Sequence, residues 1–277
     1  MSQIRIRRGK LRPARVAKYA FLVLASFLSA FSFYWMLVSA TNSNQAIMEM
    51  RMFPGANLIE NWKTLTAGYA LGTAFLNSLR NATVTTVCAL FISSLAGYGF
   101  VVYRDKYKNL VMSLLMLSMM VPAAATLIPM FRMFSRMGLN NTLLGVMLPS
   151  VSTAFLIFMF RQGTQSFPDA IIQAARIDGL GELRIFLQMY MPIMKPTYAA
   201  AATVTFMNAW NAYLWPLVIL QSPDQITMPM LISNTMNVYV VDYGMVMLAV
   251  SICTIPTLVL FFALQRSFVE GILGSVK

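Results

Sequence analysis

The sequence predicts an all-α integral membrane protein that crosses the bilayer six times. Hydrophobic residues make up 58% of its 277 positions and charged residues only 11%, against about a quarter in an average soluble domain. The apolar residues gather in six runs of 18 to 32 residues, and a spanning helix needs roughly 20. The runs lack the alternation of barrel strands. Because backbone groups in lipid must pair within their own segment, each run is expected to be helical.

The boundaries of the spans follow from the charged residues between them. Reading from charge to charge gives 19–40, about 71–102, 110–131, 143–160, about 197–220 and 243–264. The first run ends in Val38-Ser39-Ala40, which resembles a signal cleavage site. A secretory signal has an apolar core of only about 7 to 15 residues, so we predict a retained helix. Pro122 and Pro129 predict an interruption of the third span, either as a flexible pathway-lining helix or as a static packing kink.

Basic residues set the orientation, because loops on the cytoplasmic side carry an excess of Lys and Arg. Seven basic residues precede the first run, and with both termini inside, sixteen lie in the cytoplasm and five outside. The prediction is therefore a basic cytoplasmic N-terminus over 1–18 and a single transmembrane domain over 19–277. Arg80 is expected to reach the outer surface by extending its side chain.

The composition excludes several functions. The net charge of +12 is spread over the termini and loops, whereas a nucleic-acid-binding protein gathers its basic residues on one face. There is no histidine, and Cys88 and Cys253 both fall inside apolar runs, so we expect no catalytic residue and no metal site. An intramembrane enzyme would require clustered ionisable residues within the spans. The spans of this sequence hold almost none. No P-loop motif is present, so we expect no nucleotide or other cofactor on this chain.

The segment 162–195, between the fourth and fifth spans, is too long for a minimal connection. Ser166 is expected to cap a helix that has Pro168 in its first turn and Asp169 at its positive end. Gly179 stands where a helix would end in the left-handed conformation.

A second short helix is expected over about Glu182 to Tyr190, ending before Pro192 and Pro196. The small side chains of Ala174 and Ala175 would let another protein approach closely. The two short helices therefore either dock in a groove of a partner or lie on the membrane surface or on their own bundle.

The residues Gln173-Ala174-Ala175-Arg176-Ile177-Asp178-Gly179, followed by Met189-Tyr190-Met191-Pro192, resemble the EAA loop of the permease subunits of ABC importers. The family pattern is Glu-Ala-Ala, three residues, Gly, nine residues, then Ile-x-Leu-Pro, and the spacing fits without a gap. Gln173 replaces the family's Glu, so an ion pair at that position cannot form here. Two methionines, Met189 and Met191, replace Ile and Leu. We call residues 162–195 the EAA segment.

Shorter motifs extend the resemblance over most of the chain and favour the carbohydrate class, in particular the second subunit of maltose-type permeases. They are Phe53-Pro54, Asn77-Ser78, Ala96-Gly97-Tyr98-Gly99, Val121-Pro122, Gly138-Leu139-Asn140-Asn141-Thr142, Trp210-Asn211 and Trp215-Pro216-Leu217.

The resemblance implies a type I ABC importer architecture in a bacterial cell membrane. In that architecture two permease subunits form the pathway and two cytoplasmic subunits bind ATP and Mg²⁺. A solute-binding protein outside the cell delivers the substrate, expected here to be a di- or oligosaccharide. ATP then drives alternating access through the short helices. Gln173, Ala174, Ala175, Asp178 and Gly179 would dock on an ATPase, with Asp178 holding the turn through local backbone bonds.

Asn208 and Asn211 lie three residues apart on one face of the fifth span. They either contact the hydroxyls of a sugar in the pathway or bond to a neighbouring helix. Two alternatives to a sugar permease remain, a secondary transporter and an ABC permease for another solute. A secondary transporter usually shows inverted repeats and intramembrane charges, and the sequence shows neither.

Overall fold

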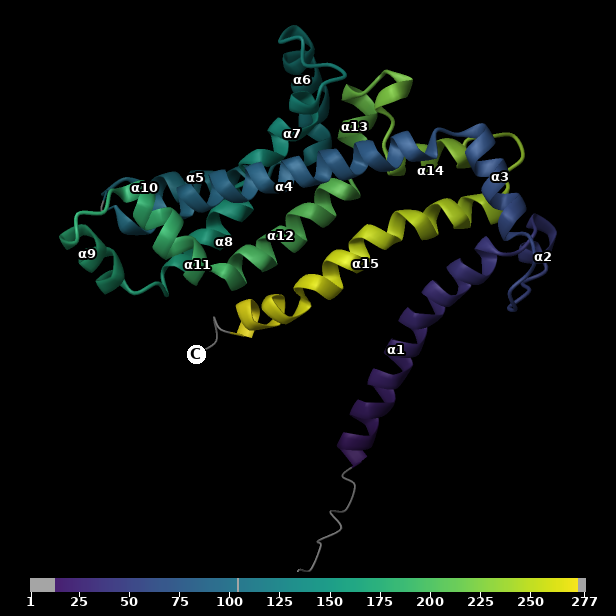
Figure 1. Cartoon of the computed structure of the whole chain (residues 1–277), viewed down its shortest axis with the longest axis horizontal. Helices are drawn as coiled ribbons and strands as arrows, with labels where there is room; N and C mark the ends of the chain where they lie inside the picture. The colour runs from purple at the N-terminus through teal and green to yellow at the C-terminus, as the bar shows by residue number, and fades with distance from the viewer. Residues whose placement is uncertain (1–12, 104, 274–277) are drawn as a thin grey trace, which may run out of the picture. The chain divides into compact units, whose positions relative to one another are not determined.

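The computed structural model describes residues 13–103 and 105–273, and within them the protein is all-helical, with no strand. Three helices are long and apolar enough to cross a membrane, or up to five if each of two bent helix pairs counts as one span. Figure 1 shows the succession of helices along the chain. The predicted all-α membrane class is confirmed. The predicted count of six crossings is not established by these helices, and the basic stretch 1–12 lies outside the described residues.

The helices fall into two compact units, one formed by the chain up to Ala67 with Tyr239–Ile252 and the other by Gly68–Val238 with Cys253 onward. The helices, in chain order, are α1 (Pro13–Ala40), α2 (Asn44–Met48), α3 (Leu58–Gly68), α4 (Leu71–Val102), α5 (Lys108–Ser118), α6 (Ala123–Arg136), α7 (Leu143–Val151), α8 (Ala154–Thr164), α9 (Asp169–Ile177), α10 (Glu182–Ile185), the π-helical turn η1 (Phe186–Tyr190), α11 (Met191–Ile193), α12 (Lys195–Trp210), α13 (Leu214–Ile219), the 3₁₀ turn η2 (Pro223–Gln225), α14 (Met228–Met236) and α15 (Tyr243–Leu273). The division does not test the predicted boundaries 1–18 and 19–277, which stay a prediction.

Asparagine side chains hold the first unit together where α1 ends. The Asn61 amide donates to the carbonyls of Ala40 and Asn42 at 2.9 and 3.0 Å, and the Asn42 amide donates to those of Val38 and Phe53. A Cβ on Gly244 would lie 2.6 Å from the Asn42 carbonyl oxygen, so only glycine fits there. The end of α1 is thus part of the folded protein, as expected for a retained helix rather than a cleaved signal.

The long helix α4 is the centre of the second unit, with α7, α8 and α12 packed along it. Small residues allow the closest approach: a Cβ on Gly97 would lie 2.5 Å from the Cβ of Phe160 in α8. Buried polar side chains also line α4, among them Asn77, Ser78 and Asn81. Because α4 is buried by protein on one side, Asn77 and Ser78 bond to protein groups instead of facing lipid, whereas Asn81 Nδ2 has no hydrogen-bond partner among the described residues.

The polar residues at the start of α4 bind the segment 221–228. Asn77 Nδ2 donates to the carbonyls of Asp224 and Ile226 at 2.8 and 3.0 Å, and Ser78 Oγ accepts the Met228 N–H at 2.7 Å. Arg80 is exposed and donates to the Gln225 side chain at 3.1 Å. Arg80 therefore has a protein partner in addition to the exposed position predicted for it.

The third and fourth predicted spans are not single straight helices. α5 and α6 meet at 99° around Met119–Pro122, and α7 and α8 meet at 47° around Ser152–Thr153. The residue before a proline avoids the helical conformation, which accounts for the break before Pro122. Pro129 lies inside α6 without ending it. Thr153 starts α8 as its N-cap, with its side chain accepting the Leu156 N–H.

The fifth predicted span, 197–220, is also wrong as a single helix. α12 ends at Trp210 with Asn211 as its cap, and α13 begins at Leu214. Trp210 is almost fully buried, and its indole Nε1 donates to the Cys253 carbonyl at 3.0 Å. α13 is held elsewhere, since Trp215 Nε1 donates to the Gly145 carbonyl of α7 at 3.0 Å. The two tryptophans thus anchor the two sides of the break to different helices.

Candidate functional site

The EAA segment contains a tight turn at Gly179, which ends α9. Gly179 has φ +78°, in the left-handed region that favours glycine. The Gly179 N–H donates to the Arg176 carbonyl at 3.1 Å, and the Leu180 N–H reaches back to the Ala175 carbonyl at 3.0 Å. This pair of bonds is a Schellman motif, in which the last carbonyls of a helix are satisfied by the residues that follow it. The predicted left-handed helix end is confirmed.

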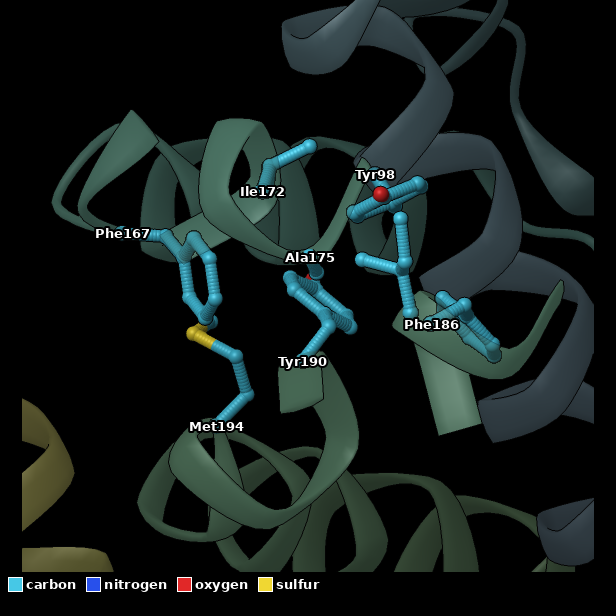
Figure 2. Packing of buried hydrophobic residues seen from close by; sticks show 8 residues of the cluster. Tyr98, Phe167, Ile172, Ala175, Phe186, Tyr190 and Met194 are labelled. Atoms are coloured by element: carbon cyan, nitrogen blue, oxygen red, sulfur yellow. The ribbon is translucent and has the colours of Figure 1, made fainter. Parts of the chain in front are cut away.

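A buried aromatic core lies against the side of α9 that carries Ile172 and Ala175 (Figure 2). Its members come from α4, from α9 and from the chain on both sides of α9, and all are nearly inaccessible: Tyr98, Phe167, Ile172, Ala175, Ile185, Phe186, Tyr190 and Met194. Tyr98 packs edge-on against both Phe186 and Tyr190, with ring centroids 5.5 and 4.9 Å apart. The Tyr190 hydroxyl lies 2.7 Å from the Thr164 hydroxyl of α8. The EAA segment therefore rests on the ends of α4 and α8.

The helix after the turn differs from the prediction. It begins at Glu182 as expected, but it continues as a π-helical turn through Tyr190 and then as α11 across Pro192, instead of ending before this proline. In the π turn the Met191 N–H bonds to the Phe186 carbonyl, five residues back. Such a turn widens the helix where proline, which has no N–H, would otherwise break the pattern. Pro196 lies in the first turn of α12, where proline is tolerated.

A carboxylate bridge joins three elements at the edge of the aromatic core. Glu182, the first residue of α10, accepts the Arg176 Nε–H on one oxygen at 2.7 Å and the Tyr103 hydroxyl on the other at 3.0 Å. Arg176 belongs to the last turn of α9, and Tyr103 directly follows α4. All three side chains are partly or largely open to solvent. The bridge therefore contributes little to stability, as is usual for exposed ion pairs, but it links three chain segments directly.

The contacts of the bridge shift the pKa values of Glu182 and Tyr103 in opposite directions. The hydrogen bond from the Arg176 guanidinium, helped by that from the Tyr103 hydroxyl, holds the pKa of the Glu182 carboxyl below its ordinary value. Burial and the hydrogen bond to this carboxylate raise the pKa of Tyr103. Because the Glu182 pKa is lowered in the folded protein, its contribution is present above the ordinary carboxyl pKa and is lost as the pH falls through the lowered value. The bridge is therefore complete at neutral pH.

The predicted docking residues divide into an exposed group and a buried one. Gln173, Ala174, Asp178 and Gly179 are exposed. Ala175 is only 5% exposed and faces the aromatic core, so its small side chain serves the subunit's own packing.

Ile177, which the sequence analysis did not single out, is 86% exposed. Gln173 and Ala174 lie four and three residues before Ile177, on the same face of α9. We call Gln173, Ala174, Ile177, Asp178 and Gly179 the exposed edge.

Two predicted roles of side chains near the turn are wrong. The Asp178 carboxylate makes no hydrogen bond among the described residues, and the turn is closed by backbone groups, including the Asp178 N–H to the Ala174 carbonyl at 3.0 Å. Ser166 does not cap α9. Its hydroxyl donates back to the Gly163 carbonyl at 2.7 Å, and Pro168 occupies the cap position without a side-chain bond. The Asp178 side chain is thus free to face a partner.

The two asparagines predicted on the fifth span are both exposed. Asn211 caps α12 and its side chain donates to the Met207 carbonyl at 2.9 Å, within its own helix. Asn208 has no hydrogen-bond partner among the described residues, and Met207 beside it is exposed as well. Neither asparagine bonds to a neighbouring helix within the part of the chain that the structure describes. Polar side chains open to the outside of an apolar helix indicate a face that meets water or protein rather than lipid.

Sequence reasoning missed the partners that the EAA segment takes from other parts of the chain. Tyr103 lies 79 positions from Glu182, and no local pattern connects them. Arg176 and Glu182 are six residues apart across a predicted glycine turn, so their opposite charges offered a usable signal. The high exposure of Ile177 could not be read from the sequence, because Ile172 and Ala175 of the same stretch are buried while Ile177 is 86% exposed.

Comparison with known sequences gives a family and several relatives. Residues 89–273 match the family model described as "Binding-protein-dependent transport system inner membrane component". The lactose transport system permease protein LacG of Rhizobium radiobacter is 44% identical over 262 residues, which cover 95% of this chain and 96% of the relative. The arabinooligosaccharide permease protein AraQ of Bacillus subtilis is 30% identical, with 95% and 96% covered. The sn-glycerol-3-phosphate permease protein UgpE of Salmonella typhi is also 30% identical, with 96% and 98% covered.

A solved structure shares the fold. It is a chain of a bacterial ABC transporter involved in the import of the acidic polysaccharide alginate, with a TM-score of 0.83 and 18% sequence identity. The match covers 94% of this chain and 98% of the other. The likeness therefore extends over nearly the whole length of both chains.

Proposed function

The chain belongs to the family of inner membrane components of binding-protein-dependent transport systems, and from this premise we propose that it forms half of the membrane pathway of a sugar importer driven by ATP. The family consists of multi-pass permease subunits, which are not themselves catalytic. ATP and Mg²⁺ are bound, and ATP is hydrolysed, by two partner ATPase subunits in the cytoplasm. The other half of the pathway is a second permease subunit, and a solute-binding protein outside the cell delivers the substrate.

One observation supports a role of this chain in coupling to an ATPase subunit: the exposed edge lies on a helix that is packed on the buried aromatic core. Ile177 is 86% exposed, and Ala174 and Gly179 beside it present almost no side-chain bulk. A freely exposed isoleucine on a short helix that is fixed by a buried core is a surface suited to a partner. A short amphipathic helix docked in a groove is a common form of recognition. We infer that the exposed edge enters a groove of an ATPase subunit.

The substrate is proposed to be a di- or oligosaccharide. The relatives named for lactose and for arabinooligosaccharides favour this class. The relative named for sn-glycerol-3-phosphate keeps a non-sugar solute as the second candidate. Asn208 and Asn211, exposed on a helix otherwise rich in apolar residues, are proposed to face the pathway, where amide groups can bond to hydroxyls of the solute.

We propose six crossings with both termini in the cytoplasm of a bacterial cell. α1, α4 and α15 cross as single helices, and the two bent pairs α5–α6 and α7–α8 cross as broken spans. The sixth crossing is α12 with α13. The 16 residues of α12 extend about 24 Å, short of the roughly 30 Å hydrocarbon core, and α13 completes the distance. The excess of basic residues in the predicted cytoplasmic loops sets the orientation.

Co-purification tests this function. The tagged chain is extracted in mild detergent from cells that express the neighbouring transporter subunits, and the bound proteins are identified. Recovery of an ATPase and a second permease is expected, with the ATPase lost from an Ala174→Leu, Gly179→Asp double variant that still binds the second permease. A chain that is well folded but purifies alone from those cells would overturn the proposal.

A further inference from the structure

The EAA segment is attached to α4 rather than only to the helices that precede and follow it in the chain. It connects α8 to α12, yet Tyr98 of α4 packs in the aromatic core, edge-on against both Phe186 and Tyr190. Tyr103, directly after α4, donates to Glu182. The apolar contact is non-directional, whereas hydrogen bonds have a preferred geometry. The carboxylate bridge therefore adds a directional link between α9 and the end of α4 to the packing of the aromatic core.

Glu182 is the central group of this bridge. Each carboxylate oxygen accepts one hydrogen bond, from Arg176 at 2.7 Å and from Tyr103 at 3.0 Å. Arg176 and Glu182 flank the Gly179 turn, where φ is +78° and a glycine leaves the backbone freer than any other residue would. The bridge adds a side-chain link across this turn to the backbone bonds that close it. It restrains rotation of α9 about the turn while keeping α9 tied to α4.

α4 can carry a displacement over its whole length. It is a single helix of 32 residues, about 48 Å long, whereas the pairs α5–α6 and α7–α8 are bent by 99° and 47° at breaks. At its other end, Asn77 and Ser78 bind the segment 221–228 through three hydrogen bonds of 2.7 to 3.0 Å. An unbroken helix with both ends tied to separate loops transmits motion, while a broken helix absorbs it at the break.

We propose that Glu182 is a positioning residue, which ties the exposed edge to α4 through Tyr103, and that α4 transmits movement of this edge to the segment 221–228. The inference rests on the proposed function, because it takes an ATPase subunit as the source of the movement. It assigns α4 a role that the order of the chain does not indicate, since α8 and α12 are the helices joined directly to the EAA segment. Arg176 acts on α4 only through Glu182.

The test measures how many solute molecules are taken up for each ATP hydrolysed by the complete transporter in proteoliposomes. Tyr103→Phe removes only the hydroxyl, and Glu182→Gln removes the charge at nearly constant size. Each is expected to lower the uptake per ATP by about two- to five-fold, the range of a single exposed charged contact. Co-purification of the ATPase is expected to stay intact. Arg184→Gln is the matched control, since Arg184 is an exposed cation on the same short helix and is not part of the bridge.

Two further measurements separate positioning from mere structural support. The double variant Tyr103→Phe, Glu182→Gln is expected to lose less than the sum of the two single losses, because both substitutions weaken the Tyr103–Glu182 contact. A fluorescent label on Gln221→Cys, in a background without Cys88 and Cys253, is expected to respond to ATP in the wild type. That response is expected to be reduced in both bridge variants and retained in Arg184→Gln.

Unchanged uptake per ATP in both single variants, fully additive losses, or a normal response at position 221 would each overturn the inference. These results are distinct from a failure of the proposed function. If the wild-type complex itself shows no uptake that depends on ATP, then the proposed function fails. If the wild-type complex is active and the bridge variants do not differ from it, then the proposed function stands and the proposed role of Glu182 and α4 is refuted.

Discussion

Substitutions at Gly179 separate backbone strain from loss of docking, because a matched glycine is present elsewhere. Gly179 and Gly138 both have positive φ, +78° and +69°. At both positions a Cβ would meet no other atom within 4 Å. Within the subunit, a substitution at either glycine therefore costs only the strain of the left-handed conformation, about 1–2 kcal/mol for alanine and less for asparagine. Gly138 precedes α7 and lies outside the EAA segment.

The expected results differ between folding and transport. Alanine at either position is expected to lower the thermal stability of the isolated subunit in detergent by a similar amount. A loss of 1–2 kcal/mol is small against the roughly 5–15 kcal/mol of a typical folded protein, so strain alone does not stop transport. Gly179→Asn and Gly179→Asp are expected to abolish uptake driven by ATP, because their side chains project from the exposed edge into the ATPase. Gly138→Asn and Gly138→Asp are expected to transport normally.

The assay is uptake of radiolabelled sugar into proteoliposomes, with the amount of inserted protein measured alongside. The reasoning is refuted if Gly179→Asp is inserted, folded and transports at the wild-type rate. It is equally refuted if the Gly138 variants lose transport as completely as the Gly179 variants, since the effect would then be strain and not docking.

The remaining predictions compare neighbouring or otherwise matched residues. Ala175→Leu is expected to destabilise the subunit by about 1–3 kcal/mol through overpacking of the aromatic core. Ala174→Leu should leave the thermal stability unchanged and release the ATPase. Equal melting temperatures of the two variants would contradict the assigned orientation of α9. Gly97→Ala is expected to separate α4 from α8 and lower the melting temperature, because its Cβ would lie 2.5 Å from the Cβ of Phe160. Gly99→Ala, with open space around it, should be neutral or slightly stabilising. A tolerated Gly97→Ala would show that these helices are not in close contact. Asn77→Ala removes two hydrogen bonds to the segment 221–228 and is expected to cost about 1–3 kcal/mol and to speed proteolysis of that segment, whereas unchanged proteolysis would show that the segment is held by other contacts.

Features with a local cause were predictable from the sequence. The turn at Gly179 follows from one glycine at the end of a short amphipathic stretch, and the Schellman bonds confirm it. Pro122 predicted an interruption of the third span, because a proline restricts the residue before it. The size of that bend, 99°, depends on how α5 and α6 pack on other helices. Local sequence does not contain this information.

Features that depend on distant partners were not predictable. Ala174 and Ala175 are identical in sequence terms, and only the position of Tyr98 beneath α9 makes one buried and the other exposed. In the sequence, Asn77 is one of several polar residues in a predicted span. In the structure, its hydrogen-bond partners are backbone carbonyls almost 150 residues away. Backbone groups of a later loop leave no mark in the sequence of α4. The same distance hides the link between Tyr103 and Glu182.

The most direct test of the central claim is uptake of labelled lactose or arabinooligosaccharide into proteoliposomes that contain defined subunits. We expect uptake only when this chain, the second permease, the ATPase subunits, the solute-binding protein and ATP are all present. We expect none from this chain alone, with or without an ion gradient. Uptake by this chain alone that follows an ion gradient would contradict the account and identify a secondary transporter.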